Sequence, residues 1–361
     1  MTWRISEDGY FCDTDHCEKM MEHPVNSTRP ANQDHLIFLC ETLSLGNPLR
    51  PPVTVTGGFH HTMWRLGTTE GLYAVKQLSA DINPNDKLNA IHFETTETVA
   101  REFAARGVPA ICALQHDGQV LQCIDATGYL VYPWVEAKAL HRSDIDRKHV
   151  ETVATIFSEM HRSRLDVPDL QEQIFEVHPE EKLTALVDFA RSRNSSRAAE
   201  LTEHLPMFLQ QIARQQQAVE YLSDRRVISH GDLDHKNVLW NELDEPLIID
   251  WESARKLNPT HEVVLEALDW SGITLDFNEA IFDCFVSAYL KSGGTGSFDE
   301  VEAACHCVMG DWVNWLMYNV GRSIDIEDAA QRRLGVEQVD HSLATLLRLE
   351  RIVPRLLAKL S

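Results

Sequence analysis

Residues 227–240 read VISHGDLDHKNVLW, and residues 246–252 read PLIIDWE. A short apolar strand delivers the carboxylate Asp232, the amide Asn237 follows five residues later, and a second strand ends at the carboxylate Asp250. Phosphoryl transfer needs a group that orients the attacking hydroxyl and accepts its proton, together with oxygen ligands for Mg²⁺ on the nucleotide phosphates. The spacing therefore predicts Asp232 as the base and Asn237 and Asp250 as the metal ligands.

Upstream, short runs of β-branched and aromatic residues at 52–56, 61–66 and 72–78 predict three antiparallel strands. Gly57 and Gly58 lie between the first two. On its own such a pair is a plain hairpin turn, but its backbone N–H groups can also bind phosphates, since glycine allows a close approach. We expect the second role here, because a lysine follows on the third strand.

That lysine, Lys76, is predicted to reach the nucleotide phosphates as a point charge. Its carboxylate partner is expected on the following helix, predicted over residues 87–106 and closed by Gly107. Glu97 is the first choice and Glu94 the second, because both fall near the apolar face of that helix.

These motifs together resemble the aminoglycoside phosphotransferase and choline kinase family, small-molecule relatives of the protein kinases. The resemblance covers residues 33–361 and is strongest at His230-Gly231-Asp232, with Asn237 and Asp250. It implies that Asp232 is the catalytic aspartate, that His230 braces the catalytic loop, and that ATP or GTP binds with Mg²⁺. It also implies a hinge from Tyr132 to Val135, including Trp134, whose backbone pairs with the nucleotide base.

The family commonly has His-Pro-Gly where this chain has Asp234-His235-Lys236, which leaves the base and both metal ligands in place. The implied fold is α+β and protein-kinase-like, with a small antiparallel-sheet N-lobe and a larger helical C-lobe. We expect an N-terminal extension over residues 1–30, a nucleotide-binding N-lobe over 31–133, and a helical C-lobe with the catalytic loop and acceptor site over 134–361. After residue 133 the pattern is helical, apart from a β segment between residues 226 and 250.

The composition narrows the substrates. The chain of 361 residues carries 33 Lys and Arg against 55 Asp and Glu, a formal net charge of −22. Binding to nucleic acid or anionic lipid relies on Lys and Arg, so neither is expected as a partner. The same field attracts cations, which makes amines plausible acceptors. The N-terminal residues lack a basic and apolar leader, and we expect a cytoplasmic protein.

The acceptor is predicted to be a small hydroxyl-bearing and cationic molecule, with an aminoglycoside-type antibiotic as the first candidate. Asp269, Asp311 and Glu327 are suggested as ligands for the ammonium groups of the acceptor. They lie in a region where most acidic side chains are expected to be solvated. Two Cys/His groups favour zinc only weakly, because neither has well-spaced ligand pairs. Their members are Cys12, His16 and Cys17, and Cys305, His306 and Cys307.

Two alternatives remain open from the sequence. The first is a metabolite kinase that acts on choline, ethanolamine, homoserine or a sugar. The second is a catalytically silent nucleotide-binding protein, against which the intact Lys76, Asp232, Asn237 and Asp250 argue. A protein kinase is disfavoured because the sequence has no Asp-Phe-Gly or Ala-Pro-Glu segment.

Overall fold

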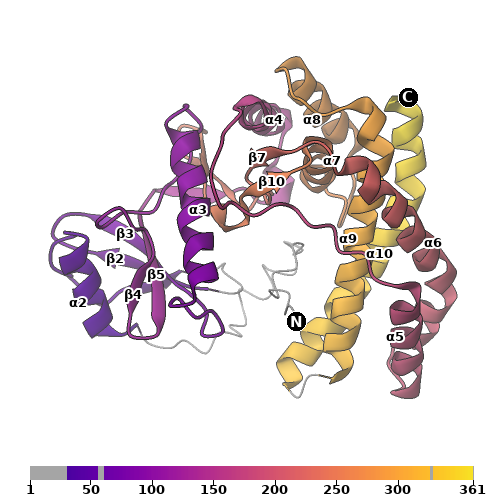
Figure 1. The fold of residues 1–361 in the computed structure, drawn as a ribbon, viewed down its shortest axis with the longest axis horizontal. Helices are drawn as coiled ribbons and strands as arrows, with labels where there is room; N and C mark the ends of the chain where they lie inside the picture. Colours follow the sequence, from indigo (N-terminus) through magenta and orange to yellow (C-terminus); the bar gives the residue numbers. More distant parts are fainter. Residues whose placement is uncertain (1–30, 56–60, 326–327, 361) are drawn as a thin grey trace.

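The structure is a computed structural model that describes residues 31–55, 61–325 and 328–360. Figure 1 shows a small lobe built on an antiparallel sheet and a larger, mainly helical lobe. The predicted two-lobed α+β fold is confirmed. Residues 1–30, the predicted extension, lie outside the described residues.

The small lobe is organised by a five-stranded antiparallel sheet with the order β1-β2-β3-β5-β4. The three predicted strands of this lobe are present, each displaced by at most one residue at either end, and two further strands complete the sheet. The bounds are β1 (Val53–Val55), β2 (Thr62–Gly67), β3 (Leu72–Gln77), β4 (Gln122–Ile124) and β5 (Thr127–Pro133).

The sheet is covered by one helix on each face. Helix α2 (Gln33–Thr42) packs in a cluster with Val75, while α3 (Lys87–Ala104) places Phe93 in a separate cluster with Leu130. Side chains alternate along a strand, and Lys76 pairs in register with Leu130. Lys76 therefore lies on the α3 face, which is the face toward the larger lobe.

Helix α3 joins the two lobes. Asp86 caps its N-terminus by accepting a hydrogen bond from the N–H of Leu88, and its last turn precedes Gly107. Its C-terminal half enters the core of the larger lobe, where Phe103 stacks on Trp251 with ring centroids 5.5 Å apart. Packing at both ends fixes α3 between the sheet of the small lobe and the core of the larger lobe.

The larger lobe contains the predicted β segment and a set of packed helices. Its helices α5, α6, α9 and α10 form an elongated layer on the side away from the sheet lobe (Figure 1). The bounds are α4 (Arg147–Arg162), α5 (Glu180–Ser192), α6 (Ala198–Leu222), β7 (Val227–Ser229), β8 (Val238–Asn241), β9 (Pro246–Ile248), α7 (Pro259–Trp270), α8 (Glu279–Lys291), α9 (Val301–Asp325) and α10 (Ala329–Leu360).

Two short strands contradict the predicted helical pattern. Strand β6 (Ala137–Ala139) pairs with β8, and β10 (Arg255–Leu257) pairs with β7. Three-residue strands are too short for an alternating pattern to be recognised. They complete two small sheets around the segment predicted to be catalytic.

Among the described residues, no helix combines the length and apolar character needed to cross a bilayer. The cytoplasmic location stays a prediction.

Candidate active site

The predicted catalytic loop turns at Gly231, directly after β7. Gly231 has a φ of +80°, and a Cβ there would overlap the carbonyl oxygen of Ser253. Only glycine meets both demands, because other residues rarely adopt this backbone and none lacks a Cβ. The preceding His230 is buried, and its Nε2 lies 2.9 Å from the carbonyl oxygen of Ile249. His230 thus ties the loop to the segment that carries Asp250, and its bracing role stays a prediction.

Asp232 and Asn237 lie in direct contact. The Asn237 Nδ2 donates to Asp232 Oδ2 at 3.0 Å and to the Asp232 carbonyl oxygen at 2.8 Å. The N–H of Ile249 donates to the Asn237 carbonyl oxygen at 3.0 Å, which brings the end of β9 beside this pair. Asp232, Asn237 and Asp250 therefore gather at one end of the small sheets.

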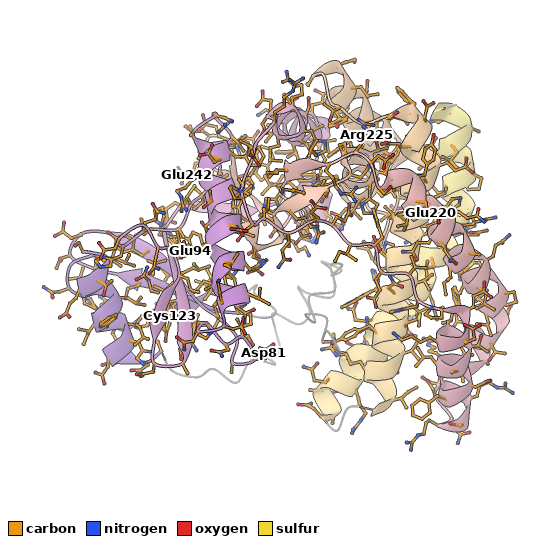
Figure 2. The ribbon with its side chains drawn as sticks, viewed as in Figure 1. Asp81, Glu94, Cys123, Glu220, Arg225 and Glu242 are labelled. Atoms are coloured by element: carbon orange, nitrogen blue, oxygen red, sulfur yellow. The ribbon has the colours of Figure 1, made fainter. Side chains whose placement is uncertain are left out.

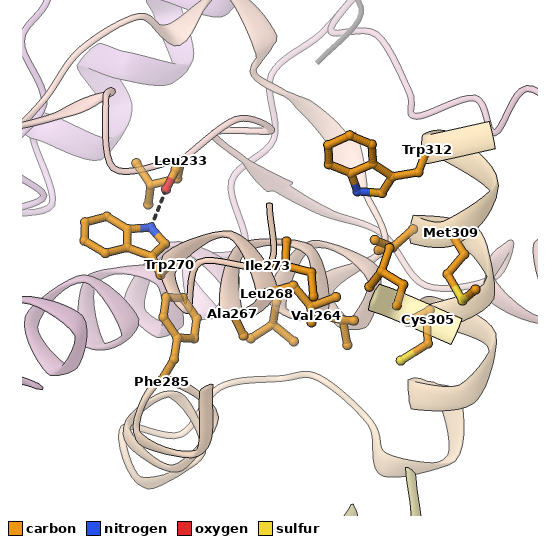
Figure 3. Packing of buried hydrophobic residues seen from close by; sticks show 14 of the residues in the cluster. Leu233, Val264, Ala267, Leu268, Trp270, Ile273, Phe285, Cys305, Met309 and Trp312 are labelled. Carbon is orange, nitrogen blue, oxygen red and sulfur yellow. Dashed lines mark hydrogen bonds between the residues drawn. The ribbon is translucent and has the colours of Figure 1, made fainter. Parts of the chain in front are cut away.

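Two buried glutamates on α7, which the sequence analysis missed, hold the loop from below. Glu262 accepts from the N–H of Gly231 at 2.8 Å, and Glu266 accepts from the N–H of Leu233 at 2.9 Å. They are one helical turn apart and bracket Asp232 on both sides. The Trp270 Nε1 also donates to the Leu233 carbonyl oxygen at 2.9 Å (Figure 3). The sequence signal that could have identified them is a pair of Glu residues at i and i+4 in an otherwise apolar helix.

The environments of these carboxyls differ. Burial, and next the charge of Asp234, raise the pKa of Asp232 well above its usual range. Burial, and next the charge of Asp232, do the same to the pKa of Glu266. Burial also opposes ionisation of Glu262, but hydrogen bonds from His161 and from the N–H of Gly231 lower its pKa overall.

Lys76 reaches across the lobes to two carboxylates. Its Nζ lies 2.7 Å from Asp250 Oδ1 and 2.6 Å from Glu252 Oε2. Glu252 also lies 3.2 Å from the Nε2 of His61. Burial lowers the pKa of Lys76, but the two carboxylates outweigh it and raise that pKa well above the ordinary lysine value. Sequence reasoning assigned no role to His61 or to Glu252, two residues after Asp250.

The predicted partner of Lys76 is wrong, because Lys76 pairs with Asp250 and Glu252 rather than with a glutamate of α3. Glu97 instead accepts from the N–H of Ala113 at 2.8 Å and from the Tyr132 hydroxyl at 2.8 Å. Glu94 accepts from backbone N–H groups of residues 120 and 121, and it projects from α3 in Figure 2. Unpaired N–H groups in the loop after α3 thus take both carboxylates, a demand that helix periodicity does not reveal. Burial raises the pKa of Glu97, which the nearby Lys76 charge partly offsets.

Two of the predicted nucleotide-binding residues, Tyr132 and Trp134, lie at the end of β5. Tyr132 points its hydroxyl at Glu97, and the N–H of Trp134 donates to the Leu72 carbonyl oxygen at 3.0 Å, at the end of the sheet. Gly57 and Gly58 lie outside the described residues.

The oxygen donors suit magnesium. The Asn237 side chain donates through its nitrogen to Asp232, and Asp250 keeps a partly exposed carboxylate beside it. Amide and carboxylate oxygens are the ligands that Mg²⁺ prefers. A second group, Asp234, His235 and Asp269, has ligand atoms within 4.8 Å of one another. Its carboxylates are already paired with Lys236 at 2.7 Å and Arg142 at 2.9 Å.

Two of the residues suggested as ammonium ligands contact basic side chains within the chain, and their role toward ammonium stays a prediction. Asp269 pairs with Arg142 and lies 3.3 Å from the Nδ1 of His235, and Asp311 lies 3.3 Å from the Nε2 of His261. Both carboxylates therefore have internal structural partners. Glu327 lies outside the described residues.

Within the described residues, the group of Cys305, His306 and Cys307 gives no support to zinc. Cys305 and Cys307 are buried in separate apolar clusters, and Cys305 packs near Met309 in Figure 3. Adjacent helical positions point apart, which explains the separation. Cys12, His16 and Cys17 lie outside the described residues.

Comparison with known proteins gives a family match. The model of a phosphotransferase enzyme family matches residues 53–300, while a search of curated proteins finds no match. Among solved structures, a spectinomycin phosphotransferase with ADP and spectinomycin is 11% identical, with a TM-score of 0.67, covering 89% of this chain and 99% of that one.

Two further solved structures share the fold. A choline kinase from Streptococcus pneumoniae is 17% identical with a TM-score of 0.57, covering 88% of this chain and 99% of its own. An ethanolamine kinase from Plasmodium vivax is 13% identical with a TM-score of 0.55, covering 94% of this chain and 96% of its own.

Proposed function

The chain belongs to the phosphotransferase enzyme family, and from this premise we propose that it transfers the γ-phosphoryl group of ATP or GTP to a hydroxyl of a small cationic molecule. It is a small-molecule kinase. The observation that carries the proposed mechanism is the convergence of four predicted residues. Asp232 contacts Asn237, Asn237 lies beside the segment of Asp250, and Asp250 pairs with Lys76.

In this mechanism Asp232 aligns the acceptor hydroxyl and takes its proton as the oxygen–phosphorus bond forms and the bond to the leaving diphosphate breaks. Asn237 and Asp250 would hold Mg²⁺, which neutralises charge on the phosphates when bound. Catalysis by such a site rests on positioning and electrostatics, because the transition state is loose. The clamp of Glu262 and Glu266 on the loop supports that positioning.

Lys76 would contact the phosphates after giving up part of its ion pair. A phosphate oxygen can replace a carboxylate as its partner, so Lys76 exchanges one anion for another and remains charged. Release of Asp250 from this pair would free its oxygen for the metal.

The acceptor is proposed to be an aminoglycoside-type antibiotic, which would make the activity a form of antibiotic resistance. The net charge of −22 favours a cation, and the similar solved structures include enzymes named for spectinomycin, choline and ethanolamine. The second candidate is a metabolite kinase that acts on choline or ethanolamine. The similar choline kinase and ethanolamine kinase structures support this candidate.

The test is a substrate panel with purified protein, Mg²⁺, and ATP or GTP. Aminoglycosides, spectinomycin, choline, ethanolamine, homoserine and a sugar are compared by nucleotide turnover and by mass of the product. We expect one cationic member to gain a phosphoryl group, and Asp232→Ala to abolish transfer while nucleotide binding survives. Full turnover by the Asp232→Ala variant would show that Asp232 is not the base. A panel in which no member reacts would rule out the antibiotic and amine acceptors.

A further inference from the structure

We propose that a cavity behind the catalytic loop binds a phosphate-type oxyanion. The cavity has a volume of about 160 Å³ and lies between the end of α4, the start of β7 and the middle of β10. Its lining includes the basic residues Arg164, Arg226 and Lys256, together with His161 and apolar residues of α4 and β7. Arg225, labelled in Figure 2, marks the segment where the chain leaves α6 and approaches β7.

The charge of this lining is opposite to that of the molecule. Three cations line the cavity and no Asp or Glu does, in a chain with 55 acids and 33 bases. Within the described ranges, the side chains of Arg164 and Lys256 have neither an ion pair nor a hydrogen bond, although Arg142, Arg197, Arg225 and Lys148 each pair with an acid. Like charges repel, so a mobile anion would relieve the cluster.

Arg226 adds an unused donor. Its Nη1 donates to the carbonyl oxygens of Leu222 at 2.9 Å and Arg225 at 3.2 Å. Its Nε is buried and has no partner in the described part of the chain. A guanidinium carries five donors in a fixed fork that matches an oxyanion, and a buried donor left without a partner is costly.

Helix ends account for the cations only in part, because Arg226 already donates to Leu222 at the end of α6. Helix α4 ends at Arg162 and α6 ends at Leu222, so both present C-terminal carbonyl groups near the cluster. Each helix end carries roughly half a negative charge, or about one unit for the two. Three side-chain charges exceed this, so the cavity lining keeps a positive charge that an anion can neutralise.

The volume of the cavity limits the size of the ligand. Pockets for drug-sized ligands measure roughly 300–1,000 Å³, so this cavity suits a single tetrahedral group rather than a nucleotide. The site is also separate from the cleft at Lys76 and Asp250, because it lies at the opposite end of β7 from the catalytic loop. One wall residue links the two regions, since the Nε2 of His161 lies 2.8 Å from Glu262, which holds Gly231.

The test is calorimetric titration of the full chain with inorganic phosphate, repeated with a non-hydrolysable ATP analogue present. We expect saturable binding that the analogue does not displace, and a loss of affinity of about tenfold or more in Lys256→Met and Arg164→Met. A parallel titration with glycerol 3-phosphate distinguishes a free ion from the phosphate group of a metabolite by which of the two binds more tightly.

The matched control is Lys138→Met, because Lys138 is also the central, unpaired lysine of a three-residue strand in the described part of the chain. It removes the same charge away from the cavity and should leave phosphate affinity unchanged. The proposal is overturned if the wild-type protein shows no saturation up to about 10 mM phosphate, or if Lys138→Met weakens binding as much as Lys256→Met. Circular dichroism of each variant confirms that the protein tested is folded.

Discussion

Gly231 shows how one position constrains the catalytic loop. Its left-handed backbone and its approach to Ser253 are separate demands. Gly231→Ala should lower the free energy of unfolding by more than the roughly 1–2 kcal/mol that left-handed backbone costs a non-glycine residue. It should also reduce kcat strongly, because Asp232 moves with the loop. Denaturant unfolding and turnover measure the two effects.

The control for that substitution is Gly107→Ala. Gly107 has a φ of +93°, but a Cβ there would meet nothing within 4 Å. It therefore incurs the backbone cost alone, without overlap, and lies outside the catalytic loop. Equal losses of stability and activity in the two variants would show that Ser253 does not restrict Gly231.

Glu266 and Glu262 form a matched pair with opposite pH dependence. The folded-state pKa of Glu266 is raised, so its contribution to stability is greatest below the unfolded value of about 4.3 and is lost as the pH rises through the folded value. Glu266→Gln keeps an acceptor for the N–H of Leu233 and cannot ionise. The free energy of unfolding of this variant, minus that of the wild type, should therefore increase from pH 4 to pH 8.

For Glu262 the sign reverses. Its folded-state pKa is lowered, so its contribution is present above about pH 4.3 and is lost as the pH falls through the folded value. Glu262→Gln should be less stable than the wild type at pH 7, and the deficit should shrink in acid. Urea unfolding across pH measures both variants, and parallel profiles for the two would contradict the assigned environments.

At the scale of elements, α3 is held by hydrogen bonds to Glu97 that cannot be predicted from the sequence of the helix itself. Glu97 is buried and is held by Ala113 and Tyr132. Tyr132→Phe removes one donor to this carboxylate and should lower the free energy of unfolding by about 1.5–3 kcal/mol. Nucleotide affinity should change little, because the proposed contact of Tyr132 with the base is made by its backbone. Thermal unfolding and nucleotide titration separate the two properties.

Tyr129→Phe is the matched control for that variant. The Tyr129 hydroxyl bonds to His35 on the opposite face of the same sheet. Its removal should affect stability without involving the cleft. A large loss of nucleotide affinity in Tyr132→Phe, absent from Tyr129→Phe, would mean that the Tyr132 side chain itself contacts the nucleotide.

The elements also show where sequence reasoning succeeds and where it stops. The β-branched and aromatic runs of the small lobe, and the α3 pattern ended by Gly107, are local signals, and the structure has those elements. The catalytic motif is equally local, which is why Asp232 and Asn237 were identified together. The partner of Lys76 is a contact across 174 residues, set by how the lobes meet, and periodicity within α3 pointed to Glu97 instead.

At the scale of the whole molecule, the net charge of −22 predicts a dependence on salt. A field of this size attracts a cationic acceptor at low ionic strength, where the screening length is about 30 Å at 0.01 M, and far less at 1 M, where it is about 3 Å. The kcat/KM for the cationic acceptor should therefore fall by about tenfold or more over this range. Steady-state rates at saturating nucleotide measure it.

An uncharged derivative of the same acceptor separates steering from general effects of salt. N-acetylation removes the ammonium charges but keeps the hydroxyl groups, so the derivative feels the field only weakly. Its kcat/KM should stay nearly constant with salt, even if it is low throughout. If both acceptors lose the same factor, salt acts on the enzyme or on nucleotide binding, and the acidic surface has no part in selecting a cation. If only the charged one declines, the excess of acids over bases helps to determine which hydroxyl compounds this kinase captures.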